Sequence, residues 1–228
     1  MIRSWPSLLL LAAFILTAWL AHGWVQQEGS LPLRTVTIDG ELAHLDGETL
    51  RLAAAEVVRG GFFSVDLRKV RDDLEALAWV DSASVRRVWP DALDVQIVEQ
   101  VPVARWGDHE LLNQRGERFL PELSQIPEGL PFLRGPEGSE RQVFERYFEF
   151  SSLLASHEIK IVRLELDRRR AWSLITDEQI RIEFGRDDTG LRMARFNKIW
   201  PLLAARSQRP GRIDLRYPNG VAVGFSNG

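Results

Sequence analysis

The stretch "RRVWPDALDVQIVEQVPVARW", from Arg86 to Trp106, decides how the first half of this chain folds. After its Trp-Pro-Asp turn, apolar residues alternate with mostly polar ones, which is the pattern of a β-strand with one apolar face and one wet face. The alternating run is Leu93, Asp94, Val95, Gln96, Ile97 and Val98. The turn and the run together predict one arm of a β-hairpin.

On the N-terminal side of this hairpin, helical spacing replaces the alternation. Apolar residues recur there at three- and four-residue steps, and Gly60-Gly61 should end the first helix because glycine adopts the left-handed conformation at low cost. Asp66 can cap a second helix. We expect the two helices to cover one face of a three-stranded sheet, with Asp94 and Gln96 on the uncovered face or its edge. The expected elements are a strand at Thr35–Asp39, helices at Glu48–Val58 and after Asp66, and strands at Ala83–Val88 and after Asp91.

The composition of the 228 residues is that of an ordinary globular protein, with 45% hydrophobic and 27% charged side chains. This length accommodates one membrane anchor and one or two domains of roughly 100 residues each. The formal net charge of -3 does not favour nucleic acid as a partner. The chain has no cysteine, which excludes a disulfide framework, a thiolate metal site and a cysteine nucleophile.

An apolar run near the N-terminus predicts a membrane anchor. From Trp5 to Val25 there is no acidic or basic side chain apart from the neutral-capable His22, and at about 1.5 Å per residue a helix of this length spans the roughly 30 Å hydrocarbon core. Arg3 before the run predicts a cytoplasmic N-terminus. A cleaved signal peptide is the alternative, because Ala21-His22-Gly23 offers small residues at a cleavage position. The expected segments are a tail at residues 1–4, the anchor at residues 5–25 and a linker at residues 26–32.

The second half of the chain predicts an antiparallel sheet with two helices. A proline-rich loop precedes the first helix, which Ser139 can cap. Asp188 or Thr189 can cap the second helix, and Pro201 should kink it by removing a backbone donor. The expected strands are Pro102–Trp106, Glu110–Asn113, Arg118–Leu120, Ile159–Leu166, Ala171–Thr176, Gln179–Phe184, and a closing hairpin of Ile213–Tyr217 and Val221–Phe225 around the turn Pro218-Asn219-Gly220.

The sequence offers no local signature of catalysis or metal binding. The four histidines are scattered without an i, i+4 pair or an H-E-x-x-H motif, and no G-x-S-x-G or phosphate-binding glycine loop is present. Asp187-Asp188 offers an acid pair, but adjacent carboxylates just before a helix more commonly serve its positive end. We therefore expect no enzyme activity, no cofactor and no metal.

Several stretches resemble one known family. The stretch "FFSVDLRKVRDDLEALAWVDSASVRRVWPDALDVQIVEQVPVARWGD" is similar to the polypeptide-transport-associated (POTRA) domain of the FtsQ/DivIB family of bacterial cell-division proteins. The pieces "RRRAWSLIT", "GRDDTGLRMARF" and "IDLRYPNGVAVGF" resemble successive parts of the β domain of that family, in the same order and with similar intervals. One departure is the short N-terminal tail, since members of the family usually carry a longer one.

The resemblance implies an α+β fold in three parts. These are a single N-terminal transmembrane helix, a POTRA domain with the order β-α-α-β-β at residues 33–100, and a mixed antiparallel-sheet β domain with two helices at residues 101–228. It also implies a single-pass type II protein of the inner membrane, with the bulk of the chain in the periplasm and enriched at the division septum.

The implied role is a non-catalytic scaffold that takes part in the control of septal peptidoglycan synthesis. The implied partners are FtsB and FtsL, in a ternary complex, and other divisome proteins such as FtsK, FtsW and FtsI. The alternative is an anchored or secreted envelope enzyme or POTRA chaperone. A transporter-type POTRA protein would carry repeated modules leading to a membrane barrel, whereas this chain carries one such unit.

The resemblance implies two sets of contact residues as well. The run Arg168-Arg169-Arg170 is, by charge alone, typical of a solvated hairpin rim, but Arg169 matches an arginine that pairs with an acidic residue of FtsB. In the terminal hairpin, an exposed edge could receive a partner strand, and a strand already paired on both sides is the alternative. The implied FtsB contacts are Arg169, Trp172, Tyr217, Val221, Val223 and Phe225, and the implied recruitment contacts of the POTRA sheet are Val85, Arg87 and Glu99.

Overall fold

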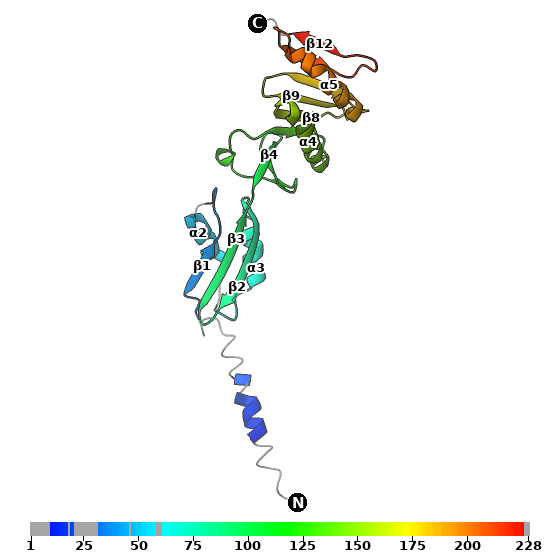
Figure 1. The fold of residues 1–228 in the computed structure, drawn as a ribbon. Helices are drawn as coiled ribbons and strands as arrows, with labels where there is room; N and C mark the ends of the chain where they lie inside the picture. The colour runs from blue at the N-terminus through cyan, green and yellow to red at the C-terminus, as the bar shows by residue number, and fades with distance from the viewer. Residues whose placement is uncertain (1–9, 18, 21–31, 46, 58–60, 226–228) are drawn as a thin grey trace, which may run out of the picture. The chain divides into compact units, whose positions relative to one another are not determined.

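The computed structural model describes residues 10–17, 19–20, 32–45, 47–57 and 61–225 (Figure 1). The chain divides into two compact units, with the boundary between Gln100 and Val101. Within the predicted anchor, residues 10–17 and 19–20 are helical, while its remaining residues, the tail and most of the linker lie outside the described part of the chain. No helix formed by the described residues is both long enough and apolar enough to cross a bilayer.

The first unit is a three-stranded sheet with two helices, in the predicted order along the chain. The central strand β3 (Ala92–Glu99) pairs in parallel with β1 (Thr35–Asp39) and antiparallel with β2 (Val80–Val88). The helices α2 (Gly47–Val57) and α3 (Leu67–Glu75) connect β1 to β2. The strand β2 begins three residues before the predicted Ala83, because the polar pair Asp81-Ser82 hides its start in the sequence.

The core of the first unit lies between the helices and one face of the sheet. Leu50, Val70 and Leu74 of the helices form one buried cluster with Leu93 and Ile97 of β3. This confirms the apolar face predicted from the alternating run.

The caps and the opposite face of the first unit refine the predictions. Asp66 caps α3 as expected, with its Oδ1 accepting from the backbone N–H of Arg68 at 2.9 Å. On the uncovered face of the sheet, Gln96 is exposed, but Asp94 is only 8% exposed because it pairs with Arg86 across the strands, with Nε to Oδ2 at 2.6 Å. The face predicted to be wet is thus partly closed by an ion pair.

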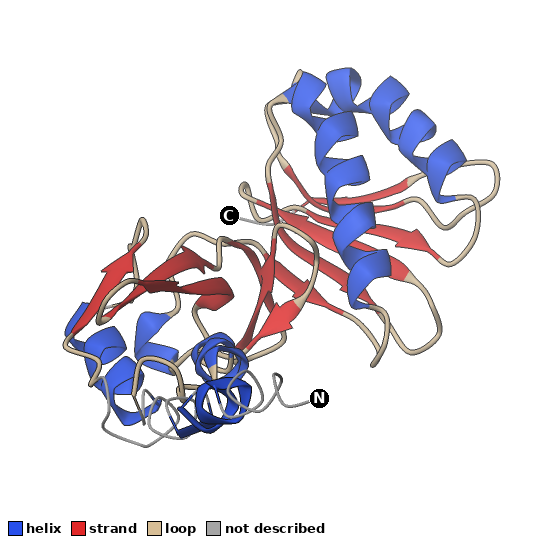
Figure 2. Ribbon diagram, turned by 90° about the horizontal axis from the view of Figure 1, so that it is seen from below, coloured by secondary structure: helices blue, strands red, loops and turns tan. Residues whose placement is uncertain are grey.

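The second unit is built on a nine-stranded sheet whose order is β12-β11-β10-β9-β8-β7-β4-β5-β6. Figure 2 shows its two long helices, α4 (Glu140–Leu154) and α5 (Thr189–Ala204), on the same face of the sheet. Two short 3-10 helices, Leu123–Gln125 and Ala155–His157, lie in the connections. The strands are β4 (Pro102–Trp106), β5 (Glu110–Asn113), β6 (Arg118–Phe119), β7 (Phe132–Arg134), β8 (Ile161–Leu166), β9 (Trp172–Thr176), β10 (Arg181–Gly185), β11 (Pro210–Asp214) and β12 (Ala222–Phe225).

This sheet contains more parallel pairing than the antiparallel pattern predicted from the sequence. The pairs β4–β7, β7–β8 and β10–β11 are parallel, and the remaining pairs are antiparallel. A helix between two strands carries the chain back to the starting end, so that α4 between β7 and β8, and α5 between β10 and β11, produce parallel neighbours. The strand β7 was not predicted, because it has only three residues and lies within the proline-rich stretch.

Local details of the second unit correct several expectations. Ser139 stands at the N-cap position of α4, but its hydroxyl donates to the carbonyl of Pro136 instead of accepting from the helix. Asp188 precedes α5 with φ of 54° and makes no capping hydrogen bond with its side chain. Pro201, by contrast, lies inside α5 as predicted. The strand β11 ends at Asp214, so Tyr217 falls in the connection to β12 and not in a strand.

Candidate binding surface

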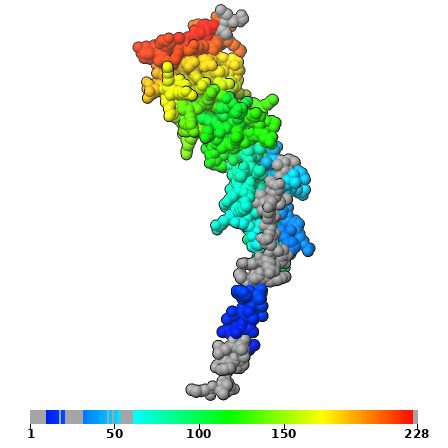
Figure 3. All heavy atoms as spheres, turned by 180° about the vertical axis from the view of Figure 1, so that it is seen from behind, coloured from blue at the N-terminus to red at the C-terminus, as the bar shows by residue number. Residues whose placement is uncertain are grey.

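The last strand of the second unit, β12, lies at one end of the nine-stranded sheet. Among the described residues it pairs only with β11, antiparallel, with Ile213 opposite Val223 and Arg212 opposite Gly224. Figure 3 shows the atoms of this part of the chain, in red, at the surface. The terminal hairpin therefore has an open outer edge, which favours the first of the two interpretations of its alternation.

The backbone of β12 points its hydrogen-bonding groups in known directions. Leu215 donates its N–H to the carbonyl of Glu183 on β10 at 2.9 Å. The N–H and C=O of one strand residue point to the same side, and the side alternates from residue to residue. The groups of Ile213 therefore also face β10, and those of Arg212 and Asp214 face β12. In β12 it follows that Gly224 faces β11, and that the N–H and C=O of Val223 face the open edge.

The side chains predicted as contacts on this hairpin are divided between the core and the surface. Val221 and Val223 are half-buried and pack against the core of the second unit. Phe225 is also half-buried, with the guanidinium carbon of Arg206 at 5.8 Å from its ring centre. Tyr217 is 55% exposed. The open edge thus presents backbone groups of β12, and the exposed ring of Tyr217 lies in the connection that precedes this strand.

A single arginine holds the connection between β11 and β12. The guanidinium of Arg195, on α5, donates to the carbonyls of Tyr217 at 2.6 Å, Pro218 at 2.7 Å and Gly220 at 3.2 Å. Three carbonyls converging on one guanidinium use its fixed fork of donors. The connection also borders a hollow of about 370 Å³, which is lined by Tyr217, Pro218, Asn219, Gly220, Val221 and Ala222. Arg195 therefore fixes the shape of the surface beside the open edge.

We expect Arg195→Ala to loosen this connection. Loss of three hydrogen bonds from a charged donor should lower the free energy of unfolding of the second unit by about 1–2 kcal/mol and speed amide exchange in residues 217–220. Hydrogen exchange and denaturant unfolding measure the two effects. Lys198→Ala removes an exposed cation from the same helix and should change neither. Equal exchange in both variants would contradict the role given to Arg195.

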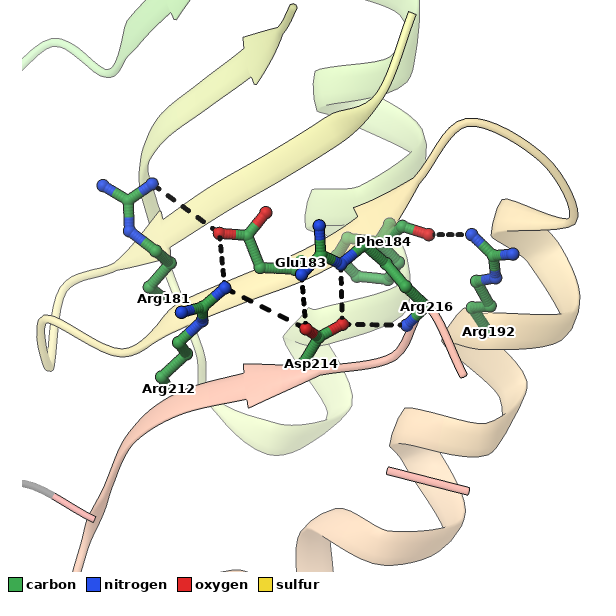
Figure 4. Close-up of polar contacts among 7 residues, drawn as sticks. All are labelled: Arg181, Glu183, Phe184, Arg192, Arg212, Asp214 and Arg216. Carbon is green, nitrogen blue, oxygen red and sulfur yellow. Dashed lines mark hydrogen bonds and ion pairs between the residues drawn. The ribbon is translucent and has the colours of Figure 1, made fainter. Parts of the chain in front are cut away.

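Next to this edge, the face of the sheet not covered by helices carries a cluster of alternating charges (Figure 4). The Glu183 carboxylate of β10 lies 3.8 Å from both Arg181 and Arg212. On β11, Asp214 accepts from Arg216 through two atoms, with Nε to Oδ1 at 2.9 Å and Nη2 to Oδ2 at 2.6 Å. Three arginines against two carboxylates leave this cluster with a positive surplus close to the open edge.

Asp214 is held in its charged form inside this cluster. It is 8% exposed, and the hydrogen bonds from the guanidinium of Arg216 outweigh burial, so that the pKa of the Asp214 carboxyl lies below its ordinary value. The same pair raises the pKa of Arg216. The ion pair of Asp214 and Arg216 is therefore formed throughout the neutral range.

The predicted arginine contact lies on an exposed turn at the end of β8. The backbone N–H of Arg169 donates to Oδ1 of Asp167 at 2.8 Å, which orders the turn. No hydrogen bond or ion pair joins the guanidinium of Arg169 to another described residue, so its charge faces solvent. Such a side chain is available to a carboxylate of another molecule.

Trp172, three residues further, is placed in the core. Its side chain is 3% exposed, lies edge-on to Phe150 with ring centres 6.4 Å apart, and has the Arg146 guanidinium 5.3 Å from its ring centre. A buried ring offers no surface to a partner. Trp172 can therefore affect a binding surface only indirectly, by helping to hold β9 in place.

The three contacts predicted on the POTRA sheet all have roles inside the first unit. Val85 is half-buried against its core. Arg87 donates from Nε to the carbonyl of Phe62 and from Nη2 to that of Val65, both at 2.7 Å. These bonds tie β2 to the loop before α3.

Glu99 is the most deeply engaged of these residues, with 9% of its surface exposed. Its carboxylate accepts from three successive backbone N–H groups, those of Ala43 at 2.7 Å, His44 at 2.8 Å and Leu45 at 2.7 Å. The ring of His44 also lies parallel to that of Trp79, with centres 4.0 Å apart. Burial alone would raise the pKa of Glu99, but the three backbone donors outweigh it and hold the pKa below its ordinary value of 4.5.

Sequence reasoning missed Arg195, Asp214 and Arg216 as members of this surface. Asp214 and Arg216 do stand two apart in the stretch "IDLRYPNG", the spacing that places side chains on one face of a strand. Arg195 carries no comparable signal, because its acceptors are backbone carbonyls 22 to 25 residues away. Of the described residues, no group of three or more His, Cys, Asp or Glu side chains could hold a metal ion.

Comparison with known proteins gives matches to both units. A model described as "POTRA domain, FtsQ-type" matches residues 31–100, and one described as "Cell division protein FtsQ/DivIB, C-terminal" matches residues 104–216. The Cell division protein FtsQ of Coxiella burnetii is 36% identical over 224 residues, which cover 97% of this chain and 91% of that protein. Those of Escherichia coli K12 and Xanthomonas campestris pv. campestris are 33% and 37% identical, cover 96% and 97% of this chain, and are themselves covered over 82% and 79% of their length. With the POTRA unit, the mixed sheet and relatives of this similarity along nearly the whole chain, this protein belongs to the FtsQ family of cell-division proteins.

Proposed function

We propose that this protein is a non-catalytic division scaffold, anchored in the inner membrane by residues 5–25, that binds FtsB by receiving one of its segments as an added strand on β12. FtsL joins the complex through FtsB, and the assembly helps to control septal peptidoglycan synthesis together with FtsK, FtsW and FtsI. The apolar run from Trp5 to Val25 and the family relatives support the anchor and the division role.

The observation that carries the proposal is the open edge of β12. A strand with unpaired N–H and C=O groups is a template for β-augmentation, in which backbone hydrogen bonds supply affinity and side-chain contacts supply specificity. Val223 presents both of its backbone groups at this edge by the alternation along the hairpin. The nearby surplus of arginine charge, and Arg169 with its free guanidinium, suit a partner segment that carries carboxylates.

The recruitment role of the POTRA sheet stays a prediction. The residues predicted to make the recruitment contacts also have structural roles inside the first unit. Arg87 and Glu99 make bonds that hold the first unit together. Substitutions there would affect recruitment through the stability of the unit as well as through direct contact. Val85 contacts the same core and falls under the same argument.

The proposal is tested by binding of the extracytoplasmic part of FtsB to the full chain. We expect Arg169→Glu to weaken binding by about tenfold, equivalent to roughly 1.4 kcal/mol, because it reverses a charge that faces a carboxylate. A basic substitution at that carboxylate of FtsB should recover part of the loss. Calorimetry at two salt concentrations provides the affinities.

The matched control is Arg168→Glu, the same charge change one residue away on the same exposed turn. It alters the net charge equally and should have a smaller effect, which separates a specific pair from general attraction. Equal losses for the two variants, without recovery by the altered FtsB, would contradict the role of Arg169. Absence of any binding between FtsB and the unaltered chain would contradict the proposed function as a whole.

A further inference from the structure

The first unit has one end at which the chain enters it. The parallel pairing of β1 with β3 places Thr35 opposite Ala92, directly after the turn between β2 and β3. Just before β1, Arg34 donates its backbone N–H to the carbonyl of Asp91 in that turn at 2.9 Å, and Pro32 bridges to Gly61. The start of the domain, the β2–β3 turn and the loop after α2 therefore meet at this end.

The same end exposes large apolar side chains. Trp89, in the β2–β3 turn, is 79% exposed, more than any other large apolar side chain of the described residues. Its neighbour Val88 is 42% exposed, and Phe63 in the loop after α2 is 48% exposed. Phe63 belongs to the same end because its carbonyl lies 3.4 Å from Nη2 of Arg87, the residue before Val88. We refer to Phe63, Val88 and Trp89 as the apolar tip.

The chemistry of the apolar tip fits the boundary between lipid and water. A tryptophan combines a large apolar surface with one N–H donor, and such rings concentrate at the headgroup level of membranes. Leaving a tryptophan, a phenylalanine and a valine together in water is unusual for a small domain. The exposure is explained if a second apolar medium lies next to them.

Chain length brings a membrane within reach of the apolar tip. The predicted anchor ends at Val25, and Pro32 is already bonded into the first unit, which leaves seven residue steps between them. A fully extended chain covers about 3.3–3.6 Å per residue, so the entry end lies within roughly 25 Å of the point where the anchor leaves the bilayer. The opposite end of β3 lies seven residues further along the strand, at Glu99.

Charges at this end do not select for an anionic surface. Arg34 lies 3.7 Å from Asp91, Arg86 pairs with Asp94 at 2.6 Å, and Arg87 is bonded to backbone carbonyls. Most of the positive charge is thus matched within the domain. Attraction to the surface should come from apolar contact, with little dependence on salt.

We infer that the apolar tip inserts into the headgroup region of the bilayer that holds the anchor, so that the POTRA unit is fixed to the membrane surface at a second point. The inference rests on the anchoring part of the proposed function. It assigns to Trp89 a contact with lipid, and it gives the POTRA unit a preferred orientation, with the β2–β3 turn toward the membrane. It does not require any partner protein.

The absence of cysteine makes a direct test simple, because a single introduced cysteine carries a fluorescent label at one chosen place. The full chain is reconstituted into vesicles of phosphatidylethanolamine and phosphatidylglycerol with the label at Val88→Cys, at Ser82→Cys or at Ala13→Cys. Ser82 is exposed on the same strand at the far end from the turn, and Ala13 lies in the predicted anchor. Quenching by nitroxide lipids reports contact with lipid, and quenching by aqueous iodide reports contact with water.

We expect nitroxide quenching at position 88 to exceed that at position 82 several-fold, with the reverse order for iodide. Adding Trp89→Asp to the Val88→Cys protein should reduce lipid quenching to the level of position 82, whereas Trp89→Phe should retain it, because a ring that prefers the interface remains. Vesicles of phosphatidylcholine alone should give the same pattern, as the attraction does not depend on lipid charge.

Three outcomes would overturn the inference in whole or in part, and they are distinguishable. Lipid quenching at position 13 combined with water-like behaviour at position 88 would leave the anchor in place and exclude insertion of the tip. Absence of lipid quenching at both positions would remove the anchor and the tip together. Equal behaviour of Trp89→Asp and the unaltered tip would exclude Trp89 as the inserting residue.

Discussion

Val223→Pro is expected to weaken FtsB binding by about 100-fold, which corresponds to roughly 2.7 kcal/mol, while the protein remains folded. The N–H of Val223 faces the open edge of β12, so a proline removes a donor that only the added strand uses. The ring also obstructs close approach of the incoming backbone. Calorimetry of FtsB binding, after circular dichroism has confirmed the fold, measures the effect.

Two variants isolate the backbone contribution. Val223→Ala removes the same half-buried side chain but keeps the N–H, and should lose much less affinity than the proline. Gly224→Pro removes an N–H on the inner side of β12, which faces β11. This substitution should therefore destabilise the hairpin itself. Undiminished binding by folded Val223→Pro protein would place the FtsB site elsewhere.

Glu99→Ala is expected to destabilise the POTRA unit by about 3 kcal/mol. It deprives three successive backbone N–H groups, those of Ala43, His44 and Leu45, of their shared acceptor in a site that is nearly closed to water. Denaturant unfolding gives the free energy. Hydrogen exchange separates peptides of the POTRA unit from those of the β domain and should show fast exchange at residues 43–45.

The dependence of this stabilisation on pH has a definite sign. The folded pKa of Glu99 is depressed, so its contribution is complete above the ordinary value near 4.5 and is lost as the pH falls through the lower folded value. The difference in unfolding free energy between the unaltered protein and Glu99→Gln should therefore shrink in acid. Glu41→Ala, an exposed glutamate of the same segment, should change stability by less than about 0.5 kcal/mol. If the difference in unfolding free energy between the unaltered protein and Glu99→Gln stayed constant as the pH was lowered below 4.5, the acceptor could not be a charged carboxylate.

The architecture was largely accessible from periodicity. The alternation of Leu93, Val95 and Ile97 and the cap at Asp66 led directly to the POTRA order, because one-sided burial leaves a strict period in a strand and a helix. Parallel pairing in the second unit was less accessible. Parallel pairing depends on which strand the chain lies beside after α4 and after α5. The residues of the two helices do not indicate that choice of neighbouring strand.

The candidate surface was predictable only in part, and mainly through the family resemblance. The exposed positions of Arg169 and Tyr217 agree with a contact role, whereas the burial of Trp172 could not be deduced, since a tryptophan suits a strand on either face. Glu99 illustrates a second limit. A carboxylate at the end of a strand gives no sign in the sequence that its acceptors are used by a loop more than 50 residues away.

The short length of the described part of β12 also has a consequence for copies of the protein that are not bound to a partner. A free strand edge invites two copies to pair and aggregate, and the segments most prone to do so run for about five to seven residues of high β propensity. The described strand has four residues, Ala222–Phe225, and two of them are alanine and glycine. The described strand is therefore expected to support little self-association of the protein through this edge.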